Sequence, residues 1–178
     1  MKILHVGQMI GGLDIYIRNT ICYADKDFEY VIVHGKGDKN KPVIKNGGTI
    51  KEYNIDLYRA LNPVKDLLSI WQTIRIIKKE NPDVIHCHSA KGGVVGRIAG
   101  FITGTKTLYT PHAFSFLSSE SSVKRKIYLT LERMVKFDSY LLACSESERE
   151  MGIDMVGYSD DHALVWNNSV PDAAKEVE

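Results

Sequence analysis

The sequence has few cysteines and none of the spacings by which cysteines bind metals or build a disulfide framework. Its three cysteines, Cys22, Cys87 and Cys144, lie far apart, and no C-x-x-C pair occurs. This pattern argues against a zinc ribbon and against a small disulfide-stapled scaffold. We therefore expect all three to be reduced residues of the core of a cytoplasmic protein.

Excess charge and long hydrophobic runs are also absent. The 23 basic and 22 acidic residues leave a net charge of +1, so the composition gives no support for a nucleic-acid partner. The longest apolar stretch, residues 92–104, contains Arg97 and falls short of the roughly 20 residues that a membrane-spanning helix needs. The start "MKILHVG" is too short an apolar run for a signal peptide. At 178 residues, the chain suits one domain or one lobe of a larger protein.

Short β-rich segments alternate with longer segments of helical periodicity. This alternation predicts an α/β fold, a Rossmann-like, doubly wound and mainly parallel sheet with helices on both faces. The expected strands are residues 2–6, 29–35, 49–55, 83–89, 105–112, 139–145 and 163–168. The expected helices are residues 63–80, 91–102 and 122–136, with a short helix after the capping-box sequence "SESE" at 145–148.

Two of these helices carry an apolar stripe and are expected to be amphipathic. The helix at 122–136 also carries a basic cluster, Lys124, Arg125 and Lys126, which is typical of a solvated helix surface but also suits contact with an anionic membrane. The stripe residues are Val64, Leu67, Leu68, Trp71 and Ile74 in the first helix and Val123, Ile127, Leu131 and Met134 in the second.

Glycines follow the first predicted strand, at the edge of a parallel sheet where ligands bind. Gly11 and Gly12 are either a plain strand-to-helix turn or a close backbone approach to an anion at the start of a helix. They do not fit the G-x-G-x-x-G fingerprint, and the second strand ends in His34 and Gly35 without an acidic residue. A nicotinamide or flavin dehydrogenase is therefore disfavoured.

Histidines follow two other predicted strands. His86 and His88 share one face of their strand, but no third ligand at a known metal spacing is evident nearby, so we expect no metal and place His88 nearer the cleft. His112 ends the next strand and is either structural or able to hydrogen-bond a substrate hydroxyl. Phe114 and Phe116 follow it in a loop that we expect to expose both rings.

Five segments, in order, resemble the N-terminal domain of family 4 glycosyltransferases, retaining enzymes of the two-lobed GT-B architecture. These segments are "MKILHV" with the glycine pair, "PDVIHCHSAKGGVVGRIAG", "TLYTPHAFSF", "YLLACSESERE" and "VWNNSVP". The resemblance implies transfer of a sugar from a nucleotide diphosphate sugar to a hydroxyl of a glycan or lipid-linked glycan in surface polysaccharide biosynthesis. It implies no cofactor and no metal, and contact with the inner membrane face.

The resemblance also assigns roles to residues at the edge of the sheet. His112 would be the catalytic residue near the transferred sugar, and Gly11 and Gly12 would approach the donor diphosphate. The acceptor side would be lined by His88, Ser89, Lys91, Ser145 and Glu146.

The resemblance further implies that this chain is one lobe of two. Residues 1–170 would form the N-terminal lobe and residues 171–178 the start of a linker to a second lobe that holds the sugar nucleotide. Residues 1–178 alone would then be inactive. The alternative that the residues leave open is a stand-alone flavodoxin-like binding or regulatory domain without catalysis. A nucleotide-sugar epimerase fits poorly, because the cofactor fingerprint is missing.

Overall fold

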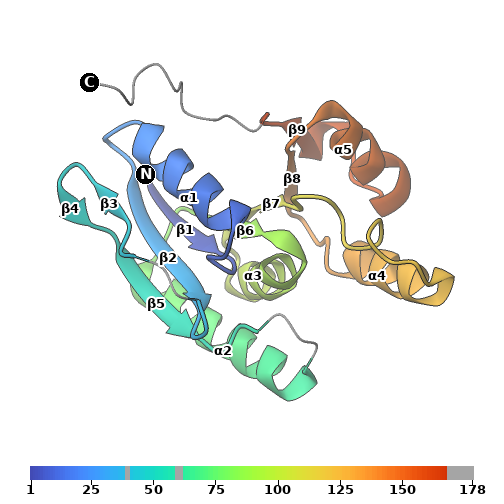
Figure 1. Cartoon of the computed structure of the whole chain (residues 1–178), viewed down its shortest axis with the longest axis horizontal. Coiled ribbons are helices and arrows are strands. Elements are labelled where there is room, and N and C mark those ends of the chain that lie inside the picture. Colours follow the sequence, from blue (N-terminus) through green and yellow to red (C-terminus); the bar gives the residue numbers. More distant parts are fainter. Residues whose placement is uncertain (39–40, 59–61, 168–178) are drawn as a thin grey trace.

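The computed structural model describes residues 1–38, 41–58 and 62–167. Seven parallel strands form one sheet in the order β5-β2-β1-β6-β7-β8-β9, with the first strand of the chain near its centre (Figure 1). The predicted α/β fold with a parallel sheet is confirmed. The strands are β1 Lys2–Val6, β2 Glu29–Gly35, β5 Lys51–Ile55, β6 Val84–His88, β7 Lys106–Thr110, β8 Tyr140–Ala143 and β9 Ala163–Val165.

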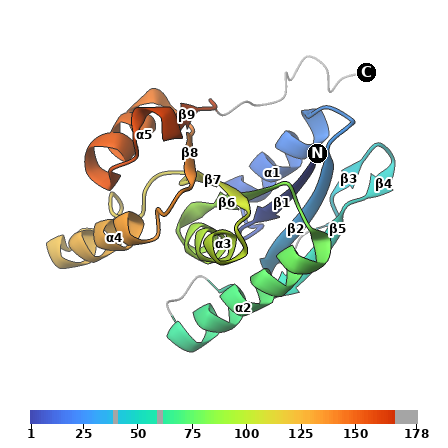
Figure 2. The same cartoon turned by 180° about the vertical axis from the view of Figure 1, so that it is seen from behind.

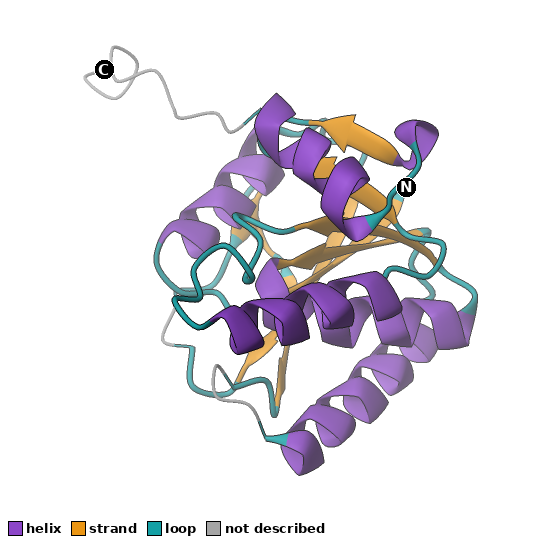
Figure 3. Cartoon of the chain, turned by 90° about the vertical axis from the view of Figure 1, so that its right-hand side faces the viewer, coloured by secondary structure: helices purple, strands orange, loops and turns teal. Residues whose placement is uncertain are grey.

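Helices cover both faces of the sheet (Figure 3). One face packs against α1, whose Ile17 and Ile21 form a small apolar cluster with Ile32 of β2. On the other face α2 and α3 lie side by side (Figure 2), and the larger core is there. The helices are α1 Gly12–Tyr23, α2 Pro63–Glu80, α3 Ser89–Thr103, α4 Ser122–Met134 and α5 Glu146–Met151, which continues as a π-helix at Gly152–Val156.

Several predicted boundaries shift by one to three residues, and one predicted strand is divided. The segment 49–55 is broken at Ile50: β5 begins at Lys51, while Thr49 belongs to a small hairpin of β3 Ile44–Lys45 and β4 Gly48–Thr49. Helix α3 begins at Ser89 rather than Lys91. The last residue of the strand predicted at 163–168 and the predicted boundary at 170/171 lie outside the described residues.

Helix α2 has the predicted bounds. The Asn62 side chain accepts a hydrogen bond from the Lys65 backbone N–H at 3.1 Å, Pro63 fills the first turn, and Asn81 ends the helix with a φ of 46°. The apolar stripe of this helix is nevertheless largely exposed. The exposed fractions are 76% for Val64, 69% for Leu67, 40% for Leu68 and 52% for Trp71.

The exposure of that stripe follows from the position of α2. Its C-terminal half packs beside α3 and β5 through Thr73, Ile76 and Ile77, whereas its N-terminal half projects away from the strands (Figure 2). The helical periodicity of the sequence gave the right element, but it did not show which turns the sheet reaches.

Helix α4 also turns its apolar stripe outward. Val123, Ile127 and Met134 are 64%, 52% and 68% exposed, whereas Glu132 is 3% exposed. Glu132 is drawn inward because it pairs with Arg97 of α3, whose Nη2 lies 2.8 Å from Glu132 Oε2. This buried ion pair and the packing of Tyr128 and Leu129 against the large core together orient the helix.

Two expectations about single residues need correction. Of the cysteines, only Cys87 is a core residue, since Cys22 is exposed and Cys144 is half-buried. Phe114 and Phe116 are not exposed but fully buried, with ring centroids 5.1 Å apart. The loop after β7 folds back and packs these rings into the large core, which anchors the residues before them.

Within the described ranges, no helix combines the length and the apolar character that crossing a bilayer requires.

Candidate functional site

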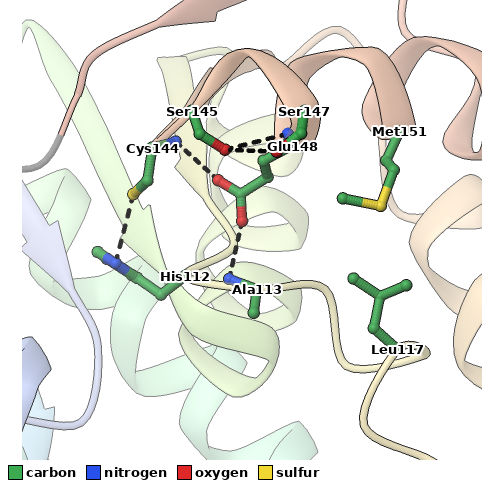
Figure 4. Close-up of a pocket in the computed structure, with 8 residues that line it drawn as sticks. All are labelled: His112, Ala113, Leu117, Cys144, Ser145, Ser147, Glu148 and Met151. Carbon is green, nitrogen blue, oxygen red and sulfur yellow. Dashed lines mark hydrogen bonds between the residues drawn. The ribbon is translucent and has the colours of Figure 1, made fainter.

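A pocket of about 430 Å³ opens where β7 and β8 end. Figure 4 shows His112 pointing toward the Cys144 sulfur, with the carboxylate of Glu148 between the two loops. The hollow thus lies at the carboxyl edge of a parallel sheet, where ligands bind in such folds. Its lining residues are His112, Ala113, Leu117, Cys144, Ser145, Ser147, Glu148 and Met151.

Glu148 fixes the backbone of this pocket. Its Oε1 accepts a hydrogen bond from the Ala113 N–H and its Oε2 one from the Cys144 N–H, each at 2.7 Å (Figure 4). Both His112 and Ala113 have left-handed φ values, 53° and 72°, which cost energy in residues other than glycine. A buried carboxylate that joins the two loops stabilises this turn.

The capping box predicted at residues 145–148 is present in part. The Ser145 hydroxyl caps α5 by accepting the Glu148 N–H at 3.2 Å. The Glu148 carboxylate, however, binds the N–H groups of Ala113 and Cys144 instead of returning to Ser145. The sequence pattern identified Glu148 as a cap and missed its role in the pocket.

His112 lies between the pocket and the interior. Its Nδ1 is 3.6 Å from Cys144 Sγ, and its Nε2 is 3.2 Å from Nδ1 of His88. Burial lowers the pKa of His112 to about 4, so the imidazole is neutral at pH 7. Tyr16 packs edge-on against this ring at 4.6 Å, which places α1 beside the pocket.

His88 is fully buried directly beneath His112, next to the pocket, and its role on the acceptor side stays a prediction. Its Nε2 is 2.9 Å from Nδ1 of His5 in the neighbouring strand β1. We call His5, His88 and His112 the imidazole row. Burial is the main reason that the pKa values of His5 and His88 are lowered, to about 3 for His5. The row is therefore a line of neutral rings that runs from the sheet interior to the pocket.

A metal could be held by three histidines beside the pocket. Ring nitrogens of His5, His86 and His88 lie within 4.8 Å of one another, and all three side chains are buried. Sequence reasoning missed His5 because it belongs to a different strand, where it pairs in register with His86. His5 and His88 are already at hydrogen-bond distance from each other, and His86 Nε2 lies 2.8 Å from Thr110 Oγ1. The absence of a metal stays a prediction.

A second cavity, of about 550 Å³, lies on the α1 face of the sheet. His5 and His86 line it, so the imidazole row separates it from the first pocket. The rest of its wall is largely apolar, including Ile3, Leu108 and Trp166, and it lies away from the carboxyl edge of the strands. The pocket at His112 is therefore the better candidate for the functional site.

The glycine pair forms an exposed loop at the start of α1. Gly11 has a φ of 59° and no side chain caps the helix there, so the N–H groups of the first turn are suited to an anion. Apart from the neighbouring residues of the chain and the backbone of α1, no heavy atom of the described residues would lie within 4 Å of a Cβ at Gly11 or Gly12. Asp38 anchors the loop by accepting the Met9 N–H at 2.7 Å. Contact of this loop with a diphosphate stays a prediction.

The other predicted acceptor residues are dispersed. Ser145 lines the pocket, whereas Ser89 is the first residue of α3 and has a φ of 58°. The Lys91 ammonium forms an ion pair with Asp66 of α2. Glu146 points outward, with its side chain 62% exposed, and pairs with Arg149 at 2.9 Å. Of this group only Ser145 lies in the same pocket as His112.

The chain belongs to glycosyltransferase family 4, whose sequence profile matches residues 10–173. A Klebsiella pneumoniae protein, described as an uncharacterized 41.2 kDa protein in the cps region, is 32% identical over 96% of this chain and 47% of its own length. An Escherichia coli enzyme, UDP-Gal:alpha-D-GlcNAc-diphosphoundecaprenol alpha-1,3-galactosyltransferase, is 29% identical over 60% of this chain and 30% of its own length.

Solved structures share the fold. Anabaena Alr3699/HepE, crystallised with UDP and glucose, superposes with a TM-score of 0.68 at 19% identity and covers 96% of this chain and 45% of its own. The lipopolysaccharide outer core galactosyltransferase WaaB gives a TM-score of 0.67 at 20% identity, and the match covers 96% of this chain and 46% of the WaaB chain. The chain thus spans less than half the length of these relatives, as one lobe of a GT-B protein would. Nothing in these likenesses supports a stand-alone flavodoxin-like domain.

Proposed function

We propose that this chain is the acceptor-side lobe of a retaining hexosyltransferase. The complete enzyme would transfer a sugar from a nucleotide diphosphate sugar to a hydroxyl of a glycan or lipid-linked glycan during surface polysaccharide biosynthesis. Family membership supports sugar transfer, and the E. coli relative's name specifies a UDP-sugar and a lipid-diphosphate acceptor. The observation that carries the proposal is a neutral imidazole, His112, fixed in the wall of a pocket at the carboxyl edge of the sheet.

The pocket suggests how the lobe contributes to transfer. His112 Nδ1 contacts the weakly hydrogen-bonding thiol of Cys144, so an oxygen atom of the sugar or its leaving phosphate can replace that contact. Ser145 and Ser147 add hydroxyl groups to the same wall. The first turn of α1, with Gly11 and Gly12, would receive charge that develops on the diphosphate. No metal or organic cofactor is required in this lobe.

The first experiment uses the complete two-lobed enzyme that this proposal requires, and a panel of nucleotide sugars with isolated glycolipid acceptors. His112→Ala should lower kcat by about 10²-fold or more, because an electrostatic contact at the reacting sugar is lost. His162→Ala is the matched control, since this histidine lies in the 3-10 helix Asp160–His162 and does not line the pocket. Unchanged turnover in His112→Ala would refute the role of the pocket.

Two further measurements test the finer statements. The anomeric configuration of the product, determined by NMR, should match that of the donor if the enzyme is retaining. Residues 1–178 alone should give no transfer, because chemistry requires the second lobe. An inverted product or robust turnover by the isolated chain would contradict this proposal.

We also propose peripheral contact with the inner face of an anionic membrane through α4. Its exposed Val123, Ile127 and Met134 share the helix with the basic cluster Lys124, Arg125 and Lys126. Apolar insertion combined with positive charge is the requirement for binding an anionic interface. Partners of this lobe are therefore a nucleotide sugar, a glycan or lipid-linked acceptor and the membrane surface, without nucleic acid.

Vesicle sedimentation tests this contact. The chain should sediment with phosphatidylglycerol vesicles and not with phosphatidylcholine vesicles, and binding should weaken as salt is raised. Ile127→Asp should abolish binding without unfolding the chain, since the residue is 52% exposed. Ile102→Asp on α3 is the matched control, because this isoleucine is 58% exposed and lies outside α4. Equal binding to both lipids would refute the membrane proposal.

A further inference from the structure

The imidazole row makes two contacts that each require one proton. One joins His5 Nδ1 to His88 Nε2 at 2.9 Å, and the other joins His88 Nδ1 to His112 Nε2 at 3.2 Å. Both nitrogens of His88 are thus occupied by other imidazoles. Each ring is neutral because burial lowers its pKa, so each carries a single N–H.

These conditions leave two proton arrangements. If His88 is protonated on Nε2, it donates to His5, so His112 must donate from its own Nε2 and its Nδ1 is bare. If His88 is protonated on Nδ1, it donates to His112 Nε2, so His112 carries its proton on Nδ1. All three rings are therefore protonated on the same nitrogen, and the arrangement at His5 determines the tautomer at the pocket.

The far end of the row distinguishes the two arrangements. His5 Nε2 is buried and has no hydrogen-bond partner in the described part of the chain. In the first arrangement this atom is an N–H without an acceptor, and in the second it is an acceptor without a donor. Among backbone groups, buried N–H donors without a partner are rarer than under-satisfied buried carbonyl acceptors. Extended to the imidazole, this asymmetry favours the arrangement with a bare His5 Nε2, in which the rings are protonated on Nδ1.

We propose that His88 and His5 are positioning residues that hold His112 in its Nδ1–H tautomer, so that His112 presents a hydrogen-bond donor to the pocket. The donor then faces Cys144 Sγ in the ligand-free pocket and an oxygen atom of the sugar or phosphate in the complex. The importance of this tautomer for turnover rests on the proposed function, whereas the tautomer itself does not.

Long-range ¹H–¹⁵N correlation spectra of the histidine-labelled chain at pH 7 test the proposal directly. His5, His88 and His112 should each show a protonated Nδ1 and a bare Nε2 as the major tautomer, with the other tautomer in the minority. A bare Nδ1 on His112, or averaged signals from its two nitrogens, overturns the proposal without any variant.

Variants at His88 separate positioning from mere packing. His88→Phe removes the donor to His112 Nε2, so the two tautomers of His112 should become comparably populated. His88→Asn supplies an amide N–H near the position of Nδ1 and should restore the Nδ1–H tautomer. His86→Phe is the matched control, because His86 is buried on the same face of β6 but bonds Thr110 instead of the row. Backbone amide spectra show whether each variant is folded.

Turnover in the complete enzyme distinguishes this inference from the proposed function. His88→Phe should lower kcat more than it changes KM, and His88→Asn should recover part of the loss. If the tautomers behave as expected but kcat is unchanged, the role of His112 in transfer fails and the tautomer assignment stands. If wild-type His112 is not held as Nδ1–H, the positioning inference fails and sugar transfer stands.

Discussion

Polar groups are buried on both faces of the sheet. The two sets differ in charge and in whether every buried polar atom has a hydrogen-bond partner. On the α3 face, Arg97 pairs with Glu132 at 2.8 Å, lies 3.8 Å from the centre of the Tyr109 ring and is itself 1% exposed. Tyr109 donates to Glu132 Oε1 at 2.9 Å. On the α1 face the imidazole row is neutral and ends at His5 Nε2, which has no partner in the described residues.

This difference indicates that the Arg97 network and the imidazole row have different roles. In the Arg97 network, opposite charges and hydrogen bonds satisfy one another, which is the condition under which buried ions are tolerated. The network joins α3, α4 and β7, and none of its three residues lines the pocket. The imidazole row leaves one atom unpaired and ends in the pocket wall, and such incomplete satisfaction is typical of functional positions. The first cluster should matter for stability and the second for chemistry.

Acid should affect the two clusters differently, and this is the largest effect we expect. The pKa values of His5, His86 and His88 are lowered by burial, so below pH 6.5 the unfolded chain binds protons that the folded chain does not. The free energy of unfolding should be constant above about pH 7 and fall as the pH decreases, by about 2 kcal/mol per buried histidine at pH 5.

Urea unfolding at pH 8, 6 and 5 measures this loss. His34 opposes this loss, because a hydrogen bond that it donates to the Asp38 carboxylate raises its pKa, so its stabilisation is present at low pH and lost as the pH rises. That single group cannot offset the buried histidines. Arg97 keeps its charge throughout, since its pKa is raised above the usual value. Stability that is equal at pH 8 and pH 5 would contradict the neutral state of the row.

Breaking the ion pair should be the next largest effect. Arg97→Met leaves Glu132 buried without its partner and should lower the free energy of unfolding by about 3–5 kcal/mol. The double variant Arg97→Met/Glu132→Leu should regain much of this loss, because no charge then remains buried. Chemical denaturation of the three proteins gives the comparison. A single-variant loss below about 1 kcal/mol would show that the network is not structural.

The buried carboxylate of the pocket should have a smaller effect on stability and a larger one on turnover. Glu148→Gln retains one acceptor oxygen for the N–H groups of Ala113 and Cys144 and should cost about 1–3 kcal/mol of stability. Because the turn that holds His112 loosens, kcat of the complete enzyme should fall about tenfold or more. A variant with reduced stability but wild-type kcat would separate Glu148 from the chemistry.

The smallest effect on stability is expected at Glu146. Its ion pair with Arg149 is exposed, so Glu146→Gln should change the free energy of unfolding by less than about 1 kcal/mol. If Glu146 contacts the acceptor, KM for the acceptor should rise while kcat and stability hardly change. An unchanged KM would remove Glu146 from the acceptor site.

The order and type of the elements could be predicted from the sequence, because periodicity and helix caps act locally. Asn62, Pro63 and Asn81 fixed both ends of α2 in this way. Which side of each helix is buried could not be predicted. Leu67 and Trp71 look like core residues, but the sheet does not extend beneath those turns of α2. Phe114 and Phe116 seemed to belong to an exposed loop, since only the folded chain shows that this loop packs inward.

The site was predictable only in part. His112 and Ser145 were found because both follow strands of a parallel sheet, whose ends share one edge. Tyr16, His5 and Glu148 were missed as site residues. Their contacts join segments that are distant in sequence, such as the 2.9 Å contact between His5 and His88, and no spacing pattern records them.

The sequence by itself determined a parallel α/β sheet with glycines, hydroxyl groups and histidines at its carboxyl edge, because local propensity and the right-handed crossover connection leave few alternatives. Tertiary structure alone decided which histidine reaches the pocket and which are sealed in the sheet beneath it. The physical reason is that burial and strand pairing depend on neighbours from other strands, and these neighbours set both the protonation and the hydrogen bonds of each ring.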